Sequence, residues 1–142
     1  MTDRLYTAQA TADGARTGRS RSRDGRLDVQ LSRPASMGGD DGPGTNPEQL
    51  FAAGYAACFH SAMRFALRPL SLRPTALEES SVTAHVHFDK ADATTFDLAV
   101  DLEGHFPALD EDTARALMDA THQLCPYSRA TRGNVPVTLH VV

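Results

Sequence analysis

The hydrophobic and polar positions of this chain follow several periods, and the longest element that they predict is a helix over residues 47–67. Asn46 is a favourable N-cap, Pro47 suits the first helical position, and Glu48 complements the positive end of the helix dipole. The pattern ends before Pro69, because the residue preceding a proline avoids helical geometry. A helix of this length spans about 30 Å. We therefore predict the central core element of the domain here, or an element shared with a partner subunit.

One face of the predicted helix carries mostly small side chains. Helical spacing places on it Gly54, Ala57, Cys58, Ser61 and Phe65. Small residues allow another backbone to approach closely, so we expect this face to be a packing surface.

Alternating patterns before and after the helix indicate strands. Residues 6–12 are compatible with a strand, residues 27–31 alternate between apolar and polar, and Asp13-Gly14 and Asp24-Gly25 are turn signals. They predict a small antiparallel meander, followed by a loop rich in Gly, Asp and Pro over residues 34–47.

Longer patterns fill the second half of the chain. Residues 81–88 and 96–106 alternate as a strand pair joined by a turn at 89–93, and residues 110–124 form a helical pattern that Pro126 ends. The inner face of this second helix is predicted to hold Ala114, Leu117, Thr121 and Leu124. A last strand, at 135–142, closes an α+β fold with helices on one side of antiparallel sheet.

Composition narrows the class of protein. The 142 residues fit one domain, 1–142, and the formal net charge of −4 argues weakly against nucleic acid as the main partner. The N-terminus lacks the apolar segment of a secretory signal, and no apolar run is long enough to cross a membrane. We therefore expect the cytoplasm, where paired cysteines are more often redox-active or metal-binding than structural.

Two cysteines, Cys58 and Cys125, are the candidate reactive groups. They lack CxxC spacing, which disfavours a zinc site. A free cysteine is commonly a small buried hydrophobe, and it becomes a nucleophile only when a cation stabilises its thiolate. The candidate cations are Arg16, Arg19, Arg21, Arg23 and Arg26, and spacing does not choose among them.

Glu48 could orient such an arginine through a bidentate ion pair. However, Glu48 and Cys58 are ten residues apart on one helix, or about 15 Å along its axis. A shared site would therefore need a break in the helix or a partner subunit, and we favour the partner.

Three segments resemble one known family. Residues 44–59 read GTNPEQLFAAGYAACF, residues 125–128 read CPYS and are followed by ATRGN at 130–134, and residues 5–8 read LYTA. These motifs resemble those of the organic hydroperoxide resistance proteins, a branch of the OsmC family. The similarity covers nearly the whole chain and includes both cysteines.

The resemblance implies a thiol peroxidase built as an intertwined homodimer of α+β subunits, with its sites at the interface. The peroxidatic cysteine falls on Cys58, the resolving cysteine on Cys125, the catalytic arginine on Arg16 and its glutamate on Glu48. Organic hydroperoxides would be reduced to alcohols, in oxidative-stress defence, through a Cys58 sulfenic acid and a Cys58–Cys125 disulfide. The implied reductant is dihydrolipoamide on lipoylated proteins, with no bound cofactor.

Several residues keep two interpretations. Four residues are candidates for lining an apolar substrate pocket, and each could equally be an ordinary core residue. They are Phe51, Phe59, Met63 and Tyr127. The run at Arg19, Arg21 and Arg23 is richer in arginine than we expect for the family, and it weakens the choice of Arg16 over Arg19. It is a solvated face, a funnel for an anionic substrate, or a docking patch for an acidic lipoyl domain.

Two other functions stay open at this stage. One is an OsmC-branch peroxidase with a different peroxide preference. The other is a non-catalytic module that binds an anion through the arginine-rich strand. His85 and His87 share a strand face but have no partner at metal-ligand spacing, so we expect no metal site.

Overall fold

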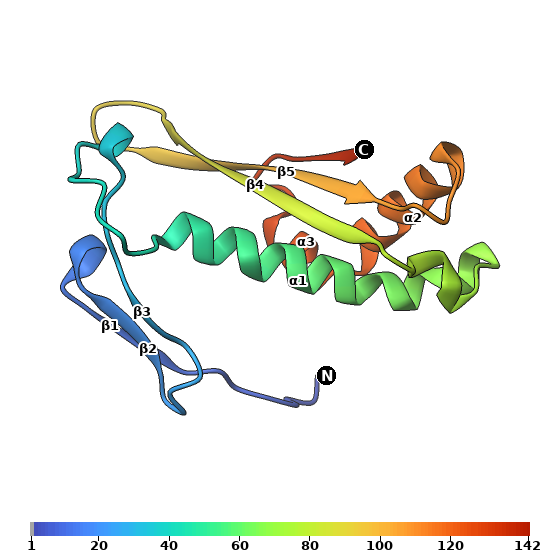
Figure 1. Ribbon diagram of the computed structural model, residues 1–142, viewed down its shortest axis with the longest axis horizontal. Coiled ribbons are helices and arrows are strands. Elements are labelled where there is room, and N and C mark those ends of the chain that lie inside the picture. The colour runs from blue at the N-terminus through green and yellow to red at the C-terminus, as the bar shows by residue number, and fades with distance from the viewer. Residues whose placement is uncertain (1) are drawn as a thin grey trace. The chain divides into compact units, whose positions relative to one another are not determined.

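The computed structural model describes residues 2–142, which form two compact units (Figure 1). Residues up to Leu50 make the N-terminal unit, and residues from Phe51 onward make the C-terminal unit. The architecture is α+β, as predicted. Among residues 2–142, no helix combines the length and apolar character that a membrane crossing requires.

The N-terminal unit contains the predicted antiparallel meander. Its strands are β1 (Ala10–Asp13), β2 (Arg19–Ser22) and β3 (Asp28–Gln30), in the order β1-β2-β3. A short 3-10 helix, η1 (Ala15–Thr17), lies between β1 and β2, and another, η2 (Ala35–Met37), lies in the predicted loop. The strands are shorter than predicted, because residues 6–9 lie outside the ladder.

This meander has almost no core of its own. Of its described residues, 2–50, Leu31 is the one buried side chain. Every residue of β1 is exposed, and those of β2 and β3 are at best half-buried. A small sheet needs an apolar face packed against something to be stable, so this unit requires a covering surface.

The long helix α1 (Pro47–Leu67) has the predicted bounds. Asn46 caps it, since its Oδ1 accepts a hydrogen bond from the backbone N of Gln49 at 2.8 Å. The buried residues of α1 are Tyr55, Phe59, Ala62, Met63, Ala66 and Leu67. The expectation that the small-residue face is packed holds for Gly54 and Cys58, which are half-buried. It is wrong for the rest of the face in the single chain, because Ala57 and Ser61 are exposed and Phe65 is 70% exposed. The larger side chains on the adjacent face bury more apolar area.

The C-terminal unit is built on a second sheet, in the order β4-β5-β6. β4 (Ser81–Lys90) and β5 (Phe96–His105) form the predicted antiparallel hairpin, whose connection is residues 91–95 rather than 89–93. β6 (Val137–Val141) pairs with β5 in parallel, so the expectation of purely antiparallel sheet is wrong. Parallel strands need a long crossover, and the segment between β5 and β6 provides it with helices (Figure 1).

That crossover holds α2 (Glu111–Leu124) and α3 (Pro126–Thr131). Asp110 caps α2 by accepting from the backbone N of Thr113 at 2.8 Å. Met118 is buried, whereas Leu124, predicted to face inward, is 45% exposed. Pro126 both stops α2 and occupies the first position of α3, a helix that the sequence pattern did not predict.

One buried cluster joins α1, α2 and the β4-β5-β6 sheet. Its largest fully buried apolar or aromatic side chains are Tyr55, Phe59, Met63, Leu102, Leu117 and Met118. Two short 3-10 helices, η3 (Arg68–Leu70) and η4 (Pro74–Leu77), connect α1 to β4. The cluster fixes α1 against the turn between α2 and α3, and each of these segments carries a cysteine.

Candidate functional site

Both cysteines of the chain lie side by side in the C-terminal unit. Cys58 is half-buried on α1, and Cys125 is fully buried between α2 and α3. Although 67 residues separate them, the Cys125 thiol donates to the Cys58 Sγ at 3.8 Å. Both are free thiols, and a disulfide between them would need only a small side-chain movement.

The surroundings of Cys58 work against its ionisation. Burial raises the pKa of the Cys58 thiol, and the neighbouring Cys125 thiol raises it further. The backbone N–H of Tyr127 donates to the sulfur and lowers the pKa, but less than burial raises it. No guanidinium from residues 51–142 contributes to this balance. A reactive thiolate at Cys58 needs a cation beside the sulfur.

A bidentate ion pair joins Arg16 and Glu48 in the N-terminal unit. Arg16 Nη1 donates to Glu48 Oε2 at 2.9 Å, and Nη2 donates to Oε1 at 2.6 Å. The two side chains are only 24% and 15% exposed. The hydrogen bonds from Arg16 lower the pKa of Glu48, and those to Glu48 raise the pKa of Arg16. The pair holds a permanently charged guanidinium in one orientation.

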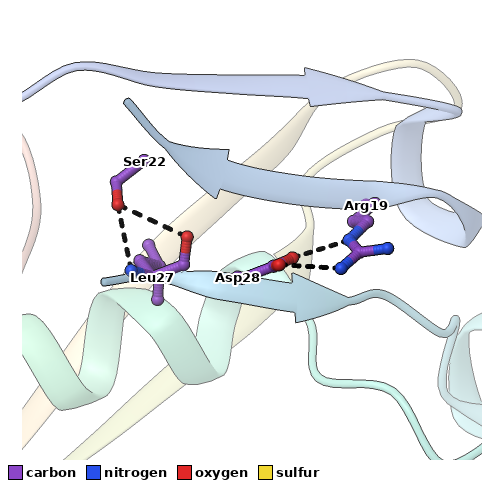
Figure 2. A network of polar contacts seen from close by, with 4 residues as sticks. All are labelled: Arg19, Ser22, Leu27 and Asp28. Atoms are coloured by element: carbon purple, nitrogen blue, oxygen red, sulfur yellow. Dashed lines mark hydrogen bonds and ion pairs between the residues drawn. The ribbon is translucent and has the colours of Figure 1, made fainter. Parts of the chain in front are cut away.

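Arg19, the competitor for this position, is held elsewhere. Figure 2 shows its guanidinium against Asp28 of the neighbouring strand, with Nε–Oδ1 at 2.6 Å and Nη2–Oδ2 at 2.7 Å. In the same sheet, Ser22 Oγ accepts from the backbone N of Leu27 at 2.9 Å. The register of the meander therefore pairs Arg16, and not Arg19, with Glu48.

The exposure of the arginine-rich strand fits the interpretation that it is a solvated face. Arg19, Arg21 and Arg23 are all exposed, at alternate positions. Arg19 is neutralised by Asp28 on the adjacent strand. The strand face therefore carries less free positive charge than its sequence indicates.

Glu48→Gln should cost about 1 kcal/mol of unfolding free energy at neutral pH, since it removes a partly buried, charged hydrogen-bond acceptor. Because Arg16 lowers the pKa of Glu48, the pair contributes its full stabilisation at any pH above the ordinary glutamate pKa of about 4.3. This stabilisation is lost as the pH falls through the lowered pKa that Glu48 has in the folded protein. Urea unfolding across this pH range should show wild type and Glu48→Gln converging in acid.

Glu111→Gln is the matched control, because Glu111 forms an exposed i,i+4 pair with Arg115 on α2. We expect it to change the unfolding free energy by only about 0.3 kcal/mol. Equal effects of the two substitutions would contradict a special contribution from the Arg16–Glu48 pair.

The four candidate wall residues fall into two groups. Phe59 and Met63 are fully buried in the core cluster, where ordinary packing accounts for them. Phe51 is half-buried and Tyr127 is 40% exposed, and their ring centroids are 6.1 Å apart. The Tyr127 ring lies over Gly54, where an added Cβ would be 2.9 Å from Tyr127 Oη. These two accessible rings belong to the segments that carry the cysteines.

A buried polar cluster next to Cys125 was not identified from the sequence. Ser128 Oγ lies 2.8 Å from both Tyr55 Oη and His122 Nδ1. Burial lowers the pKa of His122, which favours the neutral imidazole. The sequence feature that could have pointed to this cluster is the serine of the CPYS motif, a polar residue three positions after Cys125.

The histidines of β4 pair with carboxylates rather than with one another. His85 Nε2 lies 3.2 Å from Glu103 Oε1, and His87 Nε2 lies 2.8 Å from Asp101 Oδ2, on the exposed side of the sheet. Within residues 2–142, no group of three or more His, Cys, Asp or Glu side chains has a geometry suited to a metal ion.

Comparison with known proteins places the chain in one family. The family model described as OsmC-like protein matches residues 38–140. An organic hydroperoxide resistance protein of Xanthomonas axonopodis pv. citri (strain 306) is 47% identical over 135 residues, which cover 95% of this chain and 93% of that protein. The similarity therefore extends through both cysteine-bearing segments and the Arg16–Glu48 pair.

Solved structures agree in fold. The organic hydroperoxide resistance protein OsmC of Legionella pneumophila matches with a TM-score of 0.89 and 44% identity, over 98% of both chains. OhrB of Bacillus subtilis matches with a TM-score of 0.83 and 40% identity, over 98% of this chain and 100% of that one. The chain belongs to the OsmC family, in its organic hydroperoxide resistance branch.

Proposed function

We propose that this protein is a cysteine-based peroxidase that reduces organic hydroperoxides to alcohols in defence against oxidative stress. The observation that carries the proposal is the 3.8 Å separation of the Cys58 and Cys125 sulfurs in a chain of this family. Cys58 is the more accessible thiol and Cys125 the buried one, which suits them to the peroxidatic and resolving roles.

The reaction has two chemical steps. The Cys58 thiolate attacks the distal oxygen of ROOH, the O–O bond breaks, and ROH leaves with a proton, so that Cys58 becomes a sulfenic acid. The Cys125 sulfur then attacks the Cys58 sulfur, water leaves, and a disulfide forms. The two thiols together supply the two electrons that reduce the peroxide.

Arg16 is the proposed source of the cation that the thiolate needs, and Glu48 holds it in orientation. α1 is one uninterrupted helix, so a break does not bring Glu48 to the Cys58 of the same helix, about 15 Å along its axis. We therefore propose a homodimer in which the partner subunit's Arg16 acts on Cys58. A positive charge beside the sulfur would counter the effect of burial and stabilise the thiolate.

Unburied surface in both units supports the dimer. Leu31 is the one buried side chain of residues 2–50, and Ala57, Ser61 and Phe65 are exposed on α1. A second copy would cover such surfaces and supply the packing that the N-terminal unit lacks in one chain.

The proposed substrate class rests on two accessible rings in the segments that carry the thiols. Tyr127, whose backbone N–H donates to Cys58, carries an accessible ring beside that of Phe51. These rings favour alkyl or fatty-acid hydroperoxides over hydrogen peroxide, because each buried CH₂ contributes about 0.8 kcal/mol.

An external dithiol must reopen the disulfide by exchange. We propose dihydrolipoamide, or a lipoylated protein, as this reductant, and the cytoplasm as the compartment. No bound cofactor takes part in this cycle.

One equivalent of an alkyl hydroperoxide should remove both thiols of the purified, reduced protein. Intact mass should fall by about 2 Da, as expected for a disulfide, without a covalent dimer on a non-reducing gel. Cys125→Ser is the control, and it should instead gain about 16 Da as the sulfenic acid. Two thiols that stay free for minutes would mean that Cys58 is structural, and the peroxidase assignment would be withdrawn.

A further inference from the structure

A single buried hydroxyl connects the three helices around the thiol pair. Ser128 Oγ of α3 lies 2.8 Å from Tyr55 Oη of α1 and 2.8 Å from His122 Nδ1 of α2. Tyr55 and Ser128 are fully buried, and His122 is half-buried. We call these three residues the anchor triad.

The anchor triad joins the two segments that carry the cysteines. Tyr55 precedes Cys58 by three positions on α1, and Ser128 follows Cys125 by three positions across the start of α3. Residues three apart on a helix lie on neighbouring parts of one face. The hydrogen bond between Tyr55 and Ser128 therefore ties the Cys125 turn to the part of α1 that holds Cys58.

Further hydrogen bonds close the cluster. Thr131 Oγ1 donates to the Ser128 carbonyl at 3.1 Å and lies 3.3 Å from Tyr55 Oη. Arg132 Nη2 donates to the His122 carbonyl at 2.7 Å, which joins the ends of α2 and α3. A serine hydroxyl has one donor and two acceptor positions, so it serves both partners at once.

We propose that Tyr55, Ser128 and His122 are positioning residues that hold the Cys125 turn against α1 and thereby set the rate at which Cys125 captures oxidised Cys58. The inference rests on the proposed peroxidase function and deepens it. None of the three side chains is required to touch the hydroperoxide.

The position of Cys125 matters because two reactions compete for the Cys58 sulfenic acid after the first chemical step. The Cys58 sulfenic acid either condenses with Cys125, releasing water, or reacts with a second ROOH to give sulfinic acid and ROH. The first route is reversible by a dithiol, whereas the second inactivates the enzyme. A Cys125 turn that moves away from α1 slows the first route and leaves the second open.

Tyr55→Phe and His122→Leu are the test variants, because each removes one hydrogen-bonding group from Ser128 and leaves the serine in place. We expect disulfide formation to slow by about 10- to 100-fold, since a misplacement of about 1 Å can cost that much. Under excess cumene hydroperoxide, intact mass should show Cys58 sulfinic acid where wild type shows disulfide. His122→Asn, which keeps a polar group near the position of Nδ1, should restore the wild-type product ratio.

Ser81→Ala, at an exposed position on β4, is the matched control and should change neither rate nor product. Oxidation of Cys58 itself, measured for each variant in a Cys125→Ser background, should change much less than disulfide formation. That difference separates a positioning role from a general loss of structure, which would slow both steps.

Two failures are distinguishable. If wild-type Cys58 does not react with the hydroperoxide, the proposed function fails. If wild type cycles normally and the anchor-triad variants form disulfide at the wild-type rate with the same product ratio, the positioning role alone is overturned. Failure of His122→Asn to restore what His122→Leu loses would also overturn it.

Discussion

Cys58→Ser should abolish hydroperoxide reduction while leaving the fold intact. The proposed reaction needs a thiolate, and a serine hydroxyl is neither ionised at neutral pH nor a good nucleophile toward a peroxide. Turnover of cumene hydroperoxide with dihydrolipoamide should fall by more than about 1,000-fold, to the background rate. The substitution is small and the position half-buried, so circular dichroism and the melting temperature should stay close to those of wild type.

Cys125→Ser provides the comparison that assigns the two roles. It should still consume one equivalent of hydroperoxide, because Cys58 remains, but it should not form the intramolecular disulfide. If Cys58→Ser kept its function and substitution of Arg21 and Arg23 abolished it, the enzyme assignment would be abandoned. A module that binds an anion through the exposed arginine-rich strand would then explain the protein better.

Mixed dimers should recover activity that each parent variant lacks. Arg16→Ala alone should lower kcat/KM by about 100- to 1,000-fold, the usual cost of removing one group that stabilises charge in a reaction. In a dimer of one Arg16→Ala subunit and one Cys58→Ser subunit, one site combines an intact Cys58 with the partner subunit's Arg16. That site should work, and co-expression with two affinity tags should yield about half of the wild-type rate per dimer.

The arrangement of the site determines the outcome of this experiment. If Arg16 served the Cys58 of its own chain, each site of the mixed dimer would lack one of the two groups, and no activity would return. A dimer of Arg16→Ala and Arg16→Ala/Cys58→Ser subunits is the control and should stay inactive in either case. Arg16→Lys should remain well below wild type, because lysine keeps the charge but loses the bidentate geometry that Glu48 holds.

The motifs of the sequence predicted the candidate residues but not their spatial relations. The family resemblance picked out Cys58, Cys125, Arg16 and Glu48 as a set. Spacing in the sequence does not show which arginine meets Glu48, whereas the structure pairs Glu48 with Arg16, across 32 residues, and holds Arg19 against Asp28. Ser128 belongs to the CPYS motif, yet its hydrogen bond to Tyr55, 73 residues away, has no local signature in the sequence.

By itself the sequence determined the elements whose signals are local. Asn46, Pro47 and Pro69 mark the ends of α1, and no proline interrupts the helix after Pro47. The β4–β5 hairpin and the start of α2, next to Asp110, follow from equally local patterns. Such signals act within a few residues, so they can be read without knowing the rest of the fold.

Tertiary structure alone decided what depends on contacts between distant segments. α3 has six residues, too few for a helical period, and it is stabilised by its packing and by Ser128. The parallel direction of β6 was set by the crossover through α2 and α3, which alternation within a strand does not encode. The 3.8 Å approach of Cys58 to Cys125 arose in the same way, because burial of the large side chains of α1 fixes which of its faces meets the turn.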